Sequence, residues 1–211
     1  PVATMDLLAQ VLVRNRHVPR EARDTAQQIR DSAGYLMRLI HNLLDLSKSE
    51  EGKLVPKRSA IDLQALFDEV RNTFAAHAEA SDIVIETIVK TPECFADRDL
   101  IRRVLENLIE NALRHAPRNT SVTLEAVRRD DAVQIRLIDR GSGIPVEMRE
   151  RIFDRFVQLD GSSLASRSGR GLGLAFCKLA IEAHGGRIWI DDATAGTIVC
   201  IILPHDAGRS S

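Results

Sequence analysis

The first quarter of the chain carries small and apolar side chains at the spacing of a helical seam. Between residues 20 and 50 they recur at alternating intervals of four and three, at Ala22, Ala26, Ile29, Ala33, Leu36, Ile40 and Leu43. This heptad pattern predicts one long helix over about residues 20–50. Pro19 is tolerated in a first turn and marks its start, while Gly52 marks its end.

A second, shorter helix is predicted upstream. Met5, Leu8 and Leu12 repeat the same spacing, and Asn15 to Pro19 form a short connection, so the two helices should make an antiparallel hairpin. A hairpin of two helices with one apolar seam cannot bury that seam by itself. We therefore expect two copies to join as a dimeric four-helix bundle. The alternative is that the seam packs on the second domain of the same chain.

Beyond Gly52 the pattern changes to alternating strands and helices, and residues 55–59 have the composition of a domain boundary. Strands are predicted at 60–63, 83–89, 121–128, 132–138, 187–190 and 197–203, and helices at 64–80, 97–115 and 172–183. The fold class is α+β: a helical hairpin over 1–54, an α/β sandwich over 55–205, and a frayed tail over 206–211. The stretch from Val157 to Arg170 is rich in Ser and Gly and predicts a mobile loop.

Composition narrows the function by exclusion. The 211 residues are 44% hydrophobic and 28% charged, which is typical of a soluble protein. The net charge is −1, so no global field attracts nucleic acid or an anionic membrane, and phosphate chemistry must be local. Three scattered cysteines fit a reducing compartment, and no apolar run reaches the roughly 18 residues of a spanning helix. Because the chain opens at Pro1 without Met, we expect it to be a piece of a longer protein.

Two glycine-rich stretches are candidate ligand loops. Residues 139–143, Asp-Arg-Gly-Ser-Gly, follow an apolar strand, and a chance Asp-x-Gly-x-Gly is expected only ~0.05 times in such a chain. Residues 169–174, Gly-Arg-Gly-Leu-Gly-Leu, open a predicted helix, whose unpaired N–H groups and dipole favour an anion such as a phosphate. Plain turns capped by Asp139 are the alternative interpretation.

The predicted helix 97–115, which precedes both glycine-rich stretches, places Asn107 and Asn111 four residues apart on one face, beside Glu110 and Arg114. The opposite face is apolar and supplies the core contact. Asparagine is a poor helix former, so this pair favours a ligand role, for example Mg²⁺ held through a carboxamide oxygen together with substrate phosphates. A solvated polar face is the alternative.

Taken in order, these stretches resemble the sensor histidine kinases of two-component systems, whose ATP-binding domain belongs to the GHKL superfamily. Residues 105–115 resemble the asparagine box, 139–145 the first glycine box, 152–156 the phenylalanine box and 169–174 the second glycine box. Gly196-Thr197 resembles the Gly-Thr of the final strand. The hairpin, ending in residues 43–48, is similar to the family's dimerisation and histidine-phosphotransfer helices. The resemblance therefore implies a GHKL-type sandwich after the hairpin.

The resemblance also implies residue roles. Asp139 would accept the adenine amino group, Asn111 would ligate Mg²⁺, and Asn107 would order the metal and the phosphates. Arg114 and Arg155 would contact phosphates, with Asn107 and Arg114 counted as catalytic. The other implied ATP contacts are Gly141, Gly143, Gly169, Gly171, Leu172, Gly173 and Thr197. Residues 157–170 would form the ATP lid, in which Arg170 replaces a residue that is often small.

The family's phosphoacceptor histidine is followed by an acidic residue and then by a proline that Pro1 resembles. The acceptor is therefore expected just upstream of Pro1, and neither His17 nor His41 is expected to be phosphorylated. The implied enzyme is a cytoplasmic, homodimeric, ATP-dependent protein histidine kinase that passes phosphate to an aspartate of a response-regulator receiver domain. No nucleic-acid partner is expected, and membrane association would come only through other regions of the protein.

Two other functions fit parts of the sequence. A pseudokinase or docking module would keep the fold for partner binding alone, but such a scaffold needs none of Asn107, Asn111 and Asp139. An ATPase of the gyrase or chaperone type would carry a general-base Glu where this chain has Asn107, and the heptad hairpin also argues against it.

Overall fold

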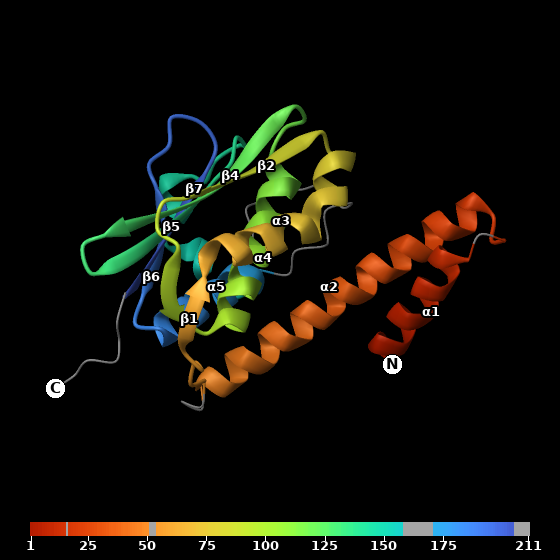
Figure 1. Cartoon of the computed structure of the whole chain (residues 1–211), viewed down its shortest axis with the longest axis horizontal. Helices are drawn as coiled ribbons and strands as arrows, with labels where there is room; N and C mark the ends of the chain where they lie inside the picture. Colours follow the sequence, from red (N-terminus) through yellow and green to blue (C-terminus); the bar gives the residue numbers. More distant parts are fainter. Residues whose placement is uncertain (16, 51–53, 158–170, 205–211) are drawn as a thin grey trace. The chain divides into compact units, whose positions relative to one another are not determined.

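The structure, a computed structural model, describes residues 1–15, 17–50, 54–157 and 171–204 (Figure 1). It divides into two compact units, Pro1–Glu50 and Glu51–Ser211. In the described part of the chain, no helix combines the length and the apolar character that a membrane crossing requires. The expected lid residues 158–170, with Gly169 and Arg170, and the expected helix terminator Gly52 lie outside the described residues.

The first unit is the predicted hairpin, with α1 at Val2–Arg14 and α2 at Arg20–Glu50. The side chains of the seam divide by size. Two of its small members are buried, with Ala26 1% and Ala33 7% exposed, and Ala9 of α1 is 3% exposed, whereas Ala22 near the start of α2 is exposed. The large apolar side chains of the seam, and others beside it on both helices, stay exposed: Met5, Leu7, Leu8, Val11, Leu12, Ile29, Leu36, Ile40, Leu43 and Leu44. Small residues thus allow close packing of the two helices, while a row of large residues is left without cover.

The second unit contains a five-stranded sheet with the strand order β2-β4-β5-β7-β6. The strands are β2 Ile83–Val89, β4 Thr120–Arg129, β5 Ala132–Ile138, β6 Arg187–Asp191 and β7 Ile198–Pro204. Only β2 and β4 pair in parallel; the other neighbours are antiparallel. The helices α3 Leu63–Ala80, α4 Arg98–His115 and α5 Gly173–Ala183 pack against the sheet, as Figure 1 shows. This confirms the predicted α+β class.

Alternating burial along the strands shows which face of the sheet the helices cover. In β4 the side chains of Val122, Leu124 and Ala126 are fully buried, and the residues between them are half-buried. Phe67 of α3 and Phe176 of α5 lie in the same core and are fully buried. Arg103 of α4 places its guanidinium carbon 4.2 Å from the centre of the Phe176 ring, which joins the two helices that carry the candidate site.

A two-stranded sheet, which pairs β1 at Ser59–Asp62 with β3 at Glu93–Ala96, starts two of the helices. Asp62 caps α3 by accepting the Ala65 N–H at 3.0 Å, so the expected strand ends one residue early and Leu63 becomes helical. The sequence did not predict β3, because four residues with two buried side chains give no measurable period. The short 3₁₀ helices η1 Val146–Met148 and η2 Arg151–Phe153 were missed for the same reason.

Candidate functional site

Asn107 lies at the contact between α4 and α5. Its side chain is only 9% exposed, which excludes a plain solvated face at this position. Its Nδ2 donates to the carbonyl oxygen of Arg103 at 2.8 Å, and a Cβ built on Gly173 would lie 3.0 Å from its Oδ1. The carboxamide oxygen of Asn107 therefore faces the first residue of α5, and Gly173 is the residue that leaves room for it.

One turn further along α4, the same face carries Asn111, Glu110 and Arg114. All three side chains are half-buried, and the Arg114 guanidinium pairs with Glu110 Oε1 at 3.4 Å. Among the residues that the structure describes, no hydrogen bond engages the Asn111 carboxamide. An uncharged oxygen donor is thus available beside a cation, which is an arrangement suited to a phosphate with its metal ion.

Asp139 follows directly after β5 and is 6% exposed. Its Oδ1 accepts the backbone N–H of Gly141 at 2.7 Å and that of Thr197 at 3.2 Å. Its own N–H donates to the carbonyl oxygen of Thr197 at 3.0 Å. The first two of these bonds, together with a hydrogen bond from the Thr197 side chain, fix the direction of the carboxylate, and the third ties the Asp139 backbone to the turn before β7. In the described part of the chain Oδ2 accepts no backbone N–H, so it can accept an N–H from a ligand.

Burial raises the pKa of the Asp139 carboxyl, while hydrogen bonds from Gly141 and Thr197 and the nearby imidazole of His115 oppose that rise. The pKa of His115 is lowered, first by burial and then by the charge of Arg114. The hydrogen bonds favour the ionised carboxylate, the form that accepts hydrogen bonds with both oxygens.

Glycines let the loop after β5 touch the turn before β7 through their backbones. Gly196 has φ +78°, and a Cβ there would lie 2.0 Å from the carbonyl oxygen of Asp139. Gly143, with φ +76°, would place a Cβ 3.0 Å from the carbonyl oxygen of Gly196, and Gly141 would place one 3.0 Å from that of His115. The glycines thus serve tight packing, and this packing is also what positions the Asp139 carboxylate.

Among the residues that the structure describes, no side chain caps the N-terminus of α5. Leu172 is its N-cap residue and is 6% exposed, and the helix starts at Gly173. Gly171, with φ +64°, would place a Cβ 2.7 Å from the Cα of Phe156, whose N–H donates to the Gly171 carbonyl oxygen at 3.0 Å. Since no described side chain engages them, the backbone N–H groups of the first turn of α5 form an arrangement suited to an anion.

The structure gathers most of the residues singled out in the sequence around α4. Asn107 meets Gly173, the end of α4 at His115 meets the loop of Asp139 and Gly141, and Thr197 reaches Asp139 from the turn before β7. Arg155 is an exposed residue after η2, and the next residue, Phe156, pairs with Gly171 just before α5. The sequence reasoning gave no ligand role to His115, and it noted Gly196 only beside Thr197. The Gly-Thr pair before the last strand was the available signal for Gly196.

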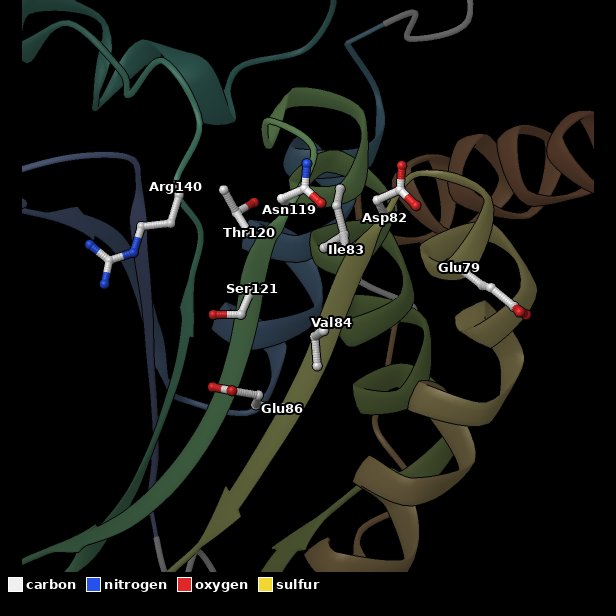
Figure 2. Close-up of a pocket in the computed structure, with 9 residues that line it drawn as sticks. All are labelled: Glu79, Asp82, Ile83, Val84, Glu86, Asn119, Thr120, Ser121 and Arg140. Atoms are coloured by element: carbon white, nitrogen blue, oxygen red, sulfur yellow. The ribbon is translucent and has the colours of Figure 1, made fainter.

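A separate hollow of about 900 Å³ lies at the β2–β4 edge of the sheet. Figure 2 shows the side chains around it, which include Asp82 and Glu86, Ser121 of β4, and Arg140. None of the residues expected to bind a nucleotide lines this hollow. It is therefore distinct from the site built on α4 and α5.

Comparison with known proteins agrees with this geometry. Residues 96–207 match the family described as histidine kinase-, DNA gyrase B-, and HSP90-like ATPase. The sensor protein IrlS of Burkholderia pseudomallei is 36% identical over 191 residues, which cover 90% of this chain and 41% of IrlS. The sensor-like histidine kinase SenX3 of Mycolicibacterium smegmatis is 29% identical over 205 residues, 96% of this chain and 53% of SenX3. The chain thus spans about half the length, or less, of these two relatives.

A solved structure shows the same fold. Full-length ShkA, crystallised in complex with AMPPNP, superimposes with a TM-score of 0.73 at 24% identity, over 97% of this chain and 43% of ShkA. The match includes both units of the chain.

Proposed function

The chain belongs to the sensor histidine kinases of the histidine kinase-, DNA gyrase B- and HSP90-like ATPase family, and we propose that it is the ATP-dependent catalytic core of such a kinase. In this reaction ATP bound by the unit Glu51–Ser211 phosphorylates a histidine. The phosphoryl group then passes to an aspartate of a response-regulator receiver domain. The enzyme acts as a homodimer in the cytoplasm.

The directed carboxylate of Asp139 is the observation that carries the proposal. Its Oδ1 is occupied by the N–H groups of Gly141 and Thr197, and its Oδ2 accepts no backbone N–H within the described residues. An adenine amino group requires an acceptor of this kind, held in one direction at the edge of a partly closed site. Gly141, Gly143 and Thr197 serve this end of the nucleotide by holding the carboxylate.

The start of α5, which no side chain in the described part of the chain caps, supports the phosphate end of the proposal. Backbone N–H groups of Gly171, Leu172 and Gly173 bind phosphate oxygens, as does the guanidinium of Arg114. We assign Arg155 and Gly169 the same task on the basis of the family resemblance alone. Phosphoryl transfer depends on positioning and charge stabilisation, so a cation at the γ-phosphate lowers the barrier.

Magnesium fits the carboxamide of Asn111, because Mg²⁺ prefers oxygen ligands and is commonly shared between a few protein oxygens and substrate phosphates. When bound, Mg²⁺ would neutralise part of the negative charge of the phosphates. Asn111 would hold it through its carboxamide oxygen. Asn107, whose Nδ2 is engaged by the Arg103 carbonyl, turns its Oδ1 toward the start of α5 and keeps that helix in place.

The phosphoacceptor is proposed to precede Pro1 in the full protein. His17 belongs to the hairpin connection, where its backbone N–H donates to Asn15 Oδ1 at 3.0 Å, and His41 is an exposed residue of α2. Labelling with γ-³²P-ATP tests the assignment. The 211-residue chain should bind Mg·ATP without incorporating acid-labile phosphate, and the chain extended by its native upstream residues should incorporate it.

The outcomes of this labelling separate the alternatives. Phosphate on His17 or His41 of the shorter chain would refute the upstream acceptor. An extended chain that binds ATP and stays unlabelled would favour the pseudokinase function, in which nucleotide binding serves only to dock a partner. An extended chain that binds no nucleotide at all would refute the assignment of the ATP site itself.

We predict a dimer held by the hairpin, because α1 and α2 leave a row of large apolar side chains exposed that includes Leu36 and Ile40. Light scattering should give about twice the 23.4 kDa of one chain. The double variant Leu36→Glu, Ile40→Glu should be monomeric with unchanged helix content, because the buried alanines remain. A wild-type chain that is monomeric at tens of micromolar would contradict the bundle.

A further inference from the structure

The segment 54–58, which leads from the chain's first unit into β1, is tied down at two points. The backbone N–H of Lys57 donates to Asp97 Oδ2 at 2.8 Å. The guanidinium of Arg58 donates to the carbonyl oxygen of Ala183 at 3.3 Å. Asp97 is the N-cap of α4, and Ala183 is the last residue of α5. This short segment therefore holds one end of each helix that carries the candidate nucleotide site.

His184 joins these two anchor points directly. Its ring is 2% exposed and lies between the helices. Nδ1 is 2.6 Å from the carbonyl oxygen of Ala180, so Nδ1 must carry the hydrogen and donate it. Nε2 then has a free lone pair, which accepts the backbone N–H of Asp97 at 2.9 Å. Both nitrogens are satisfied in one neutral tautomer.

Protonation of this ring would remove the contact with α4. A hydrogen on Nε2 would face the N–H of Asp97, and two donors cannot share a hydrogen bond. The charged groups that act on the imidazole are Arg58 on the segment and the carboxylate of Asp97 on α4. Asp97 is already committed, because it accepts the N–H groups of Asp99 and Leu100 as the helix cap and that of Lys57.

The effect of pH on stability follows the same direction. Burial foremost, and also the charge of Arg58, lowers the pKa of His184 below its ordinary value of 6.5, against the opposing effects of the hydrogen bond to the Ala180 carbonyl and of the Asp97 charge. The folded state thus binds the proton less readily than the unfolded chain. The contribution of this contact to stability is complete above pH 6.5 and is lost as the pH falls below it.

Lys57, Arg58, Asp97 and His184 lie at the ends of the two helices that carry the candidate nucleotide site. Asp97 starts the helix that carries Asn107 and Asn111, and His184 follows the helix whose first residue, Gly173, faces Asn107. We propose that Lys57, Arg58, Asp97 and His184 form a latch in which neutral His184 is a positioning residue. The latch fixes the spacing of α4 and α5, and its release couples the segment 54–58 to the nucleotide site.

The latch can be tested without nucleotide, by NMR on the 211-residue chain between pH 8 and pH 5. His184 should appear as the Nδ1–H tautomer at high pH. Amide hydrogen exchange at Lys57 should increase at least tenfold, beyond its ordinary dependence on pH, as His184 takes up its proton. The amide of Val122 in the sheet should not show this step. A His184→Gln variant keeps an acceptor for Asp97 but does not titrate, so the step should disappear.

Two results would overturn the latch. One is a Lys57 amide whose exchange is unaffected by the protonation of His184. The other is a His184→Gln variant that keeps the same pH step, since the step would then belong to another group. Nucleotide affinity is not used for this pH test, because His115 titrates close to Asp139 and would affect it.

Coupling to the site rests on the proposed function and has its own measurement. Arg58→Ala removes the contact with Ala183 and leaves His184 in place, so Mg·ADP affinity measured by calorimetry should fall at least threefold. Arg118→Ala is the matched control, because it removes a surface arginine paired with Asp82 and should leave the affinity unchanged. Equal affinities for Arg58→Ala and the wild type would refute the coupling. If no variant binds nucleotide, the proposed function fails, and the NMR result still decides the latch.

Discussion

Replacement of Asp139 by alanine is expected to lower the affinity of the chain for Mg·ATP by about ten- to a hundredfold. A hydrogen bond to a charged group contributes about 1.5–3 kcal/mol, and about 1.4 kcal/mol corresponds to a factor of ten in affinity. The variant also leaves the N–H groups of Gly141 and Thr197 without their acceptor. Isothermal titration calorimetry at pH 7.5 measures the effect directly.

Asp139→Asn is the matched variant that separates binding from folding. Its Oδ1 can still accept from Gly141 and Thr197, so the thermal midpoint should stay close to that of the wild type. Its Nδ2, however, donates where adenine requires an acceptor, so affinity should fall as strongly as in Asp139→Ala. If Asp139→Asn binds ATP as the wild type does, Asp139 does not contact the adenine amino group.

Replacement of Gly196 by alanine is expected to destabilise the unit Glu51–Ser211 by about 2–5 kcal/mol. The left-handed φ of +78° costs an L-residue about 1–2 kcal/mol. The new Cβ would also lie 2.0 Å from the carbonyl oxygen of Asp139, which is backbone and cannot move without shifting the carboxylate. Urea unfolding followed by the fluorescence of Trp189, the only tryptophan, reports on this unit alone.

Gly185→Ala provides the control for Gly196→Ala. Gly185 has a similar φ of +71°, but the nearest atom to a new Cβ is the side-chain Cγ of Pro204 at 3.9 Å. Only the conformational cost of about 1–2 kcal/mol should then be seen. Equal losses for the two variants would mean that the contact between Gly196 and Asp139 contributes nothing measurable. Mg·ATP affinity should decrease only in Gly196→Ala.

Local pattern was sufficient for most helix and strand bounds. The expected helix over 20–50 is α2 at Arg20–Glu50, and the strand over 132–138 is β5 at Ala132–Ile138. These elements are long enough for their apolar positions to repeat several times, so the period is unambiguous. The strand β3 failed this condition, and its pairing with β1 was invisible until the chain was folded.

The candidate site was only partly predictable. Asn107, Asn111 and Asp139 stood out because their residue types are unusual for a helix face or a strand end, and the family resemblance added their order along the chain. The sequence did not reveal that Asn107 is buried against Gly173. That contact joins residues far apart in the chain, and its signal is a glycine that could equally serve a turn.

By itself, the sequence determined the hairpin, the α/β order of the second unit and the residue types suited to ATP, since all of these follow from local periodicity and short motifs. Only the tertiary structure decided which seam residues are covered and which carboxylate oxygen of Asp139 accepts the backbone N–H groups of Gly141 and Thr197. It alone placed His184 against Asp97, 87 residues away, and Arg58 against Ala183, 125 residues away. These contacts satisfy single backbone donors and acceptors at helix ends, and such pairings depend on the packing of whole elements rather than on neighbouring residues.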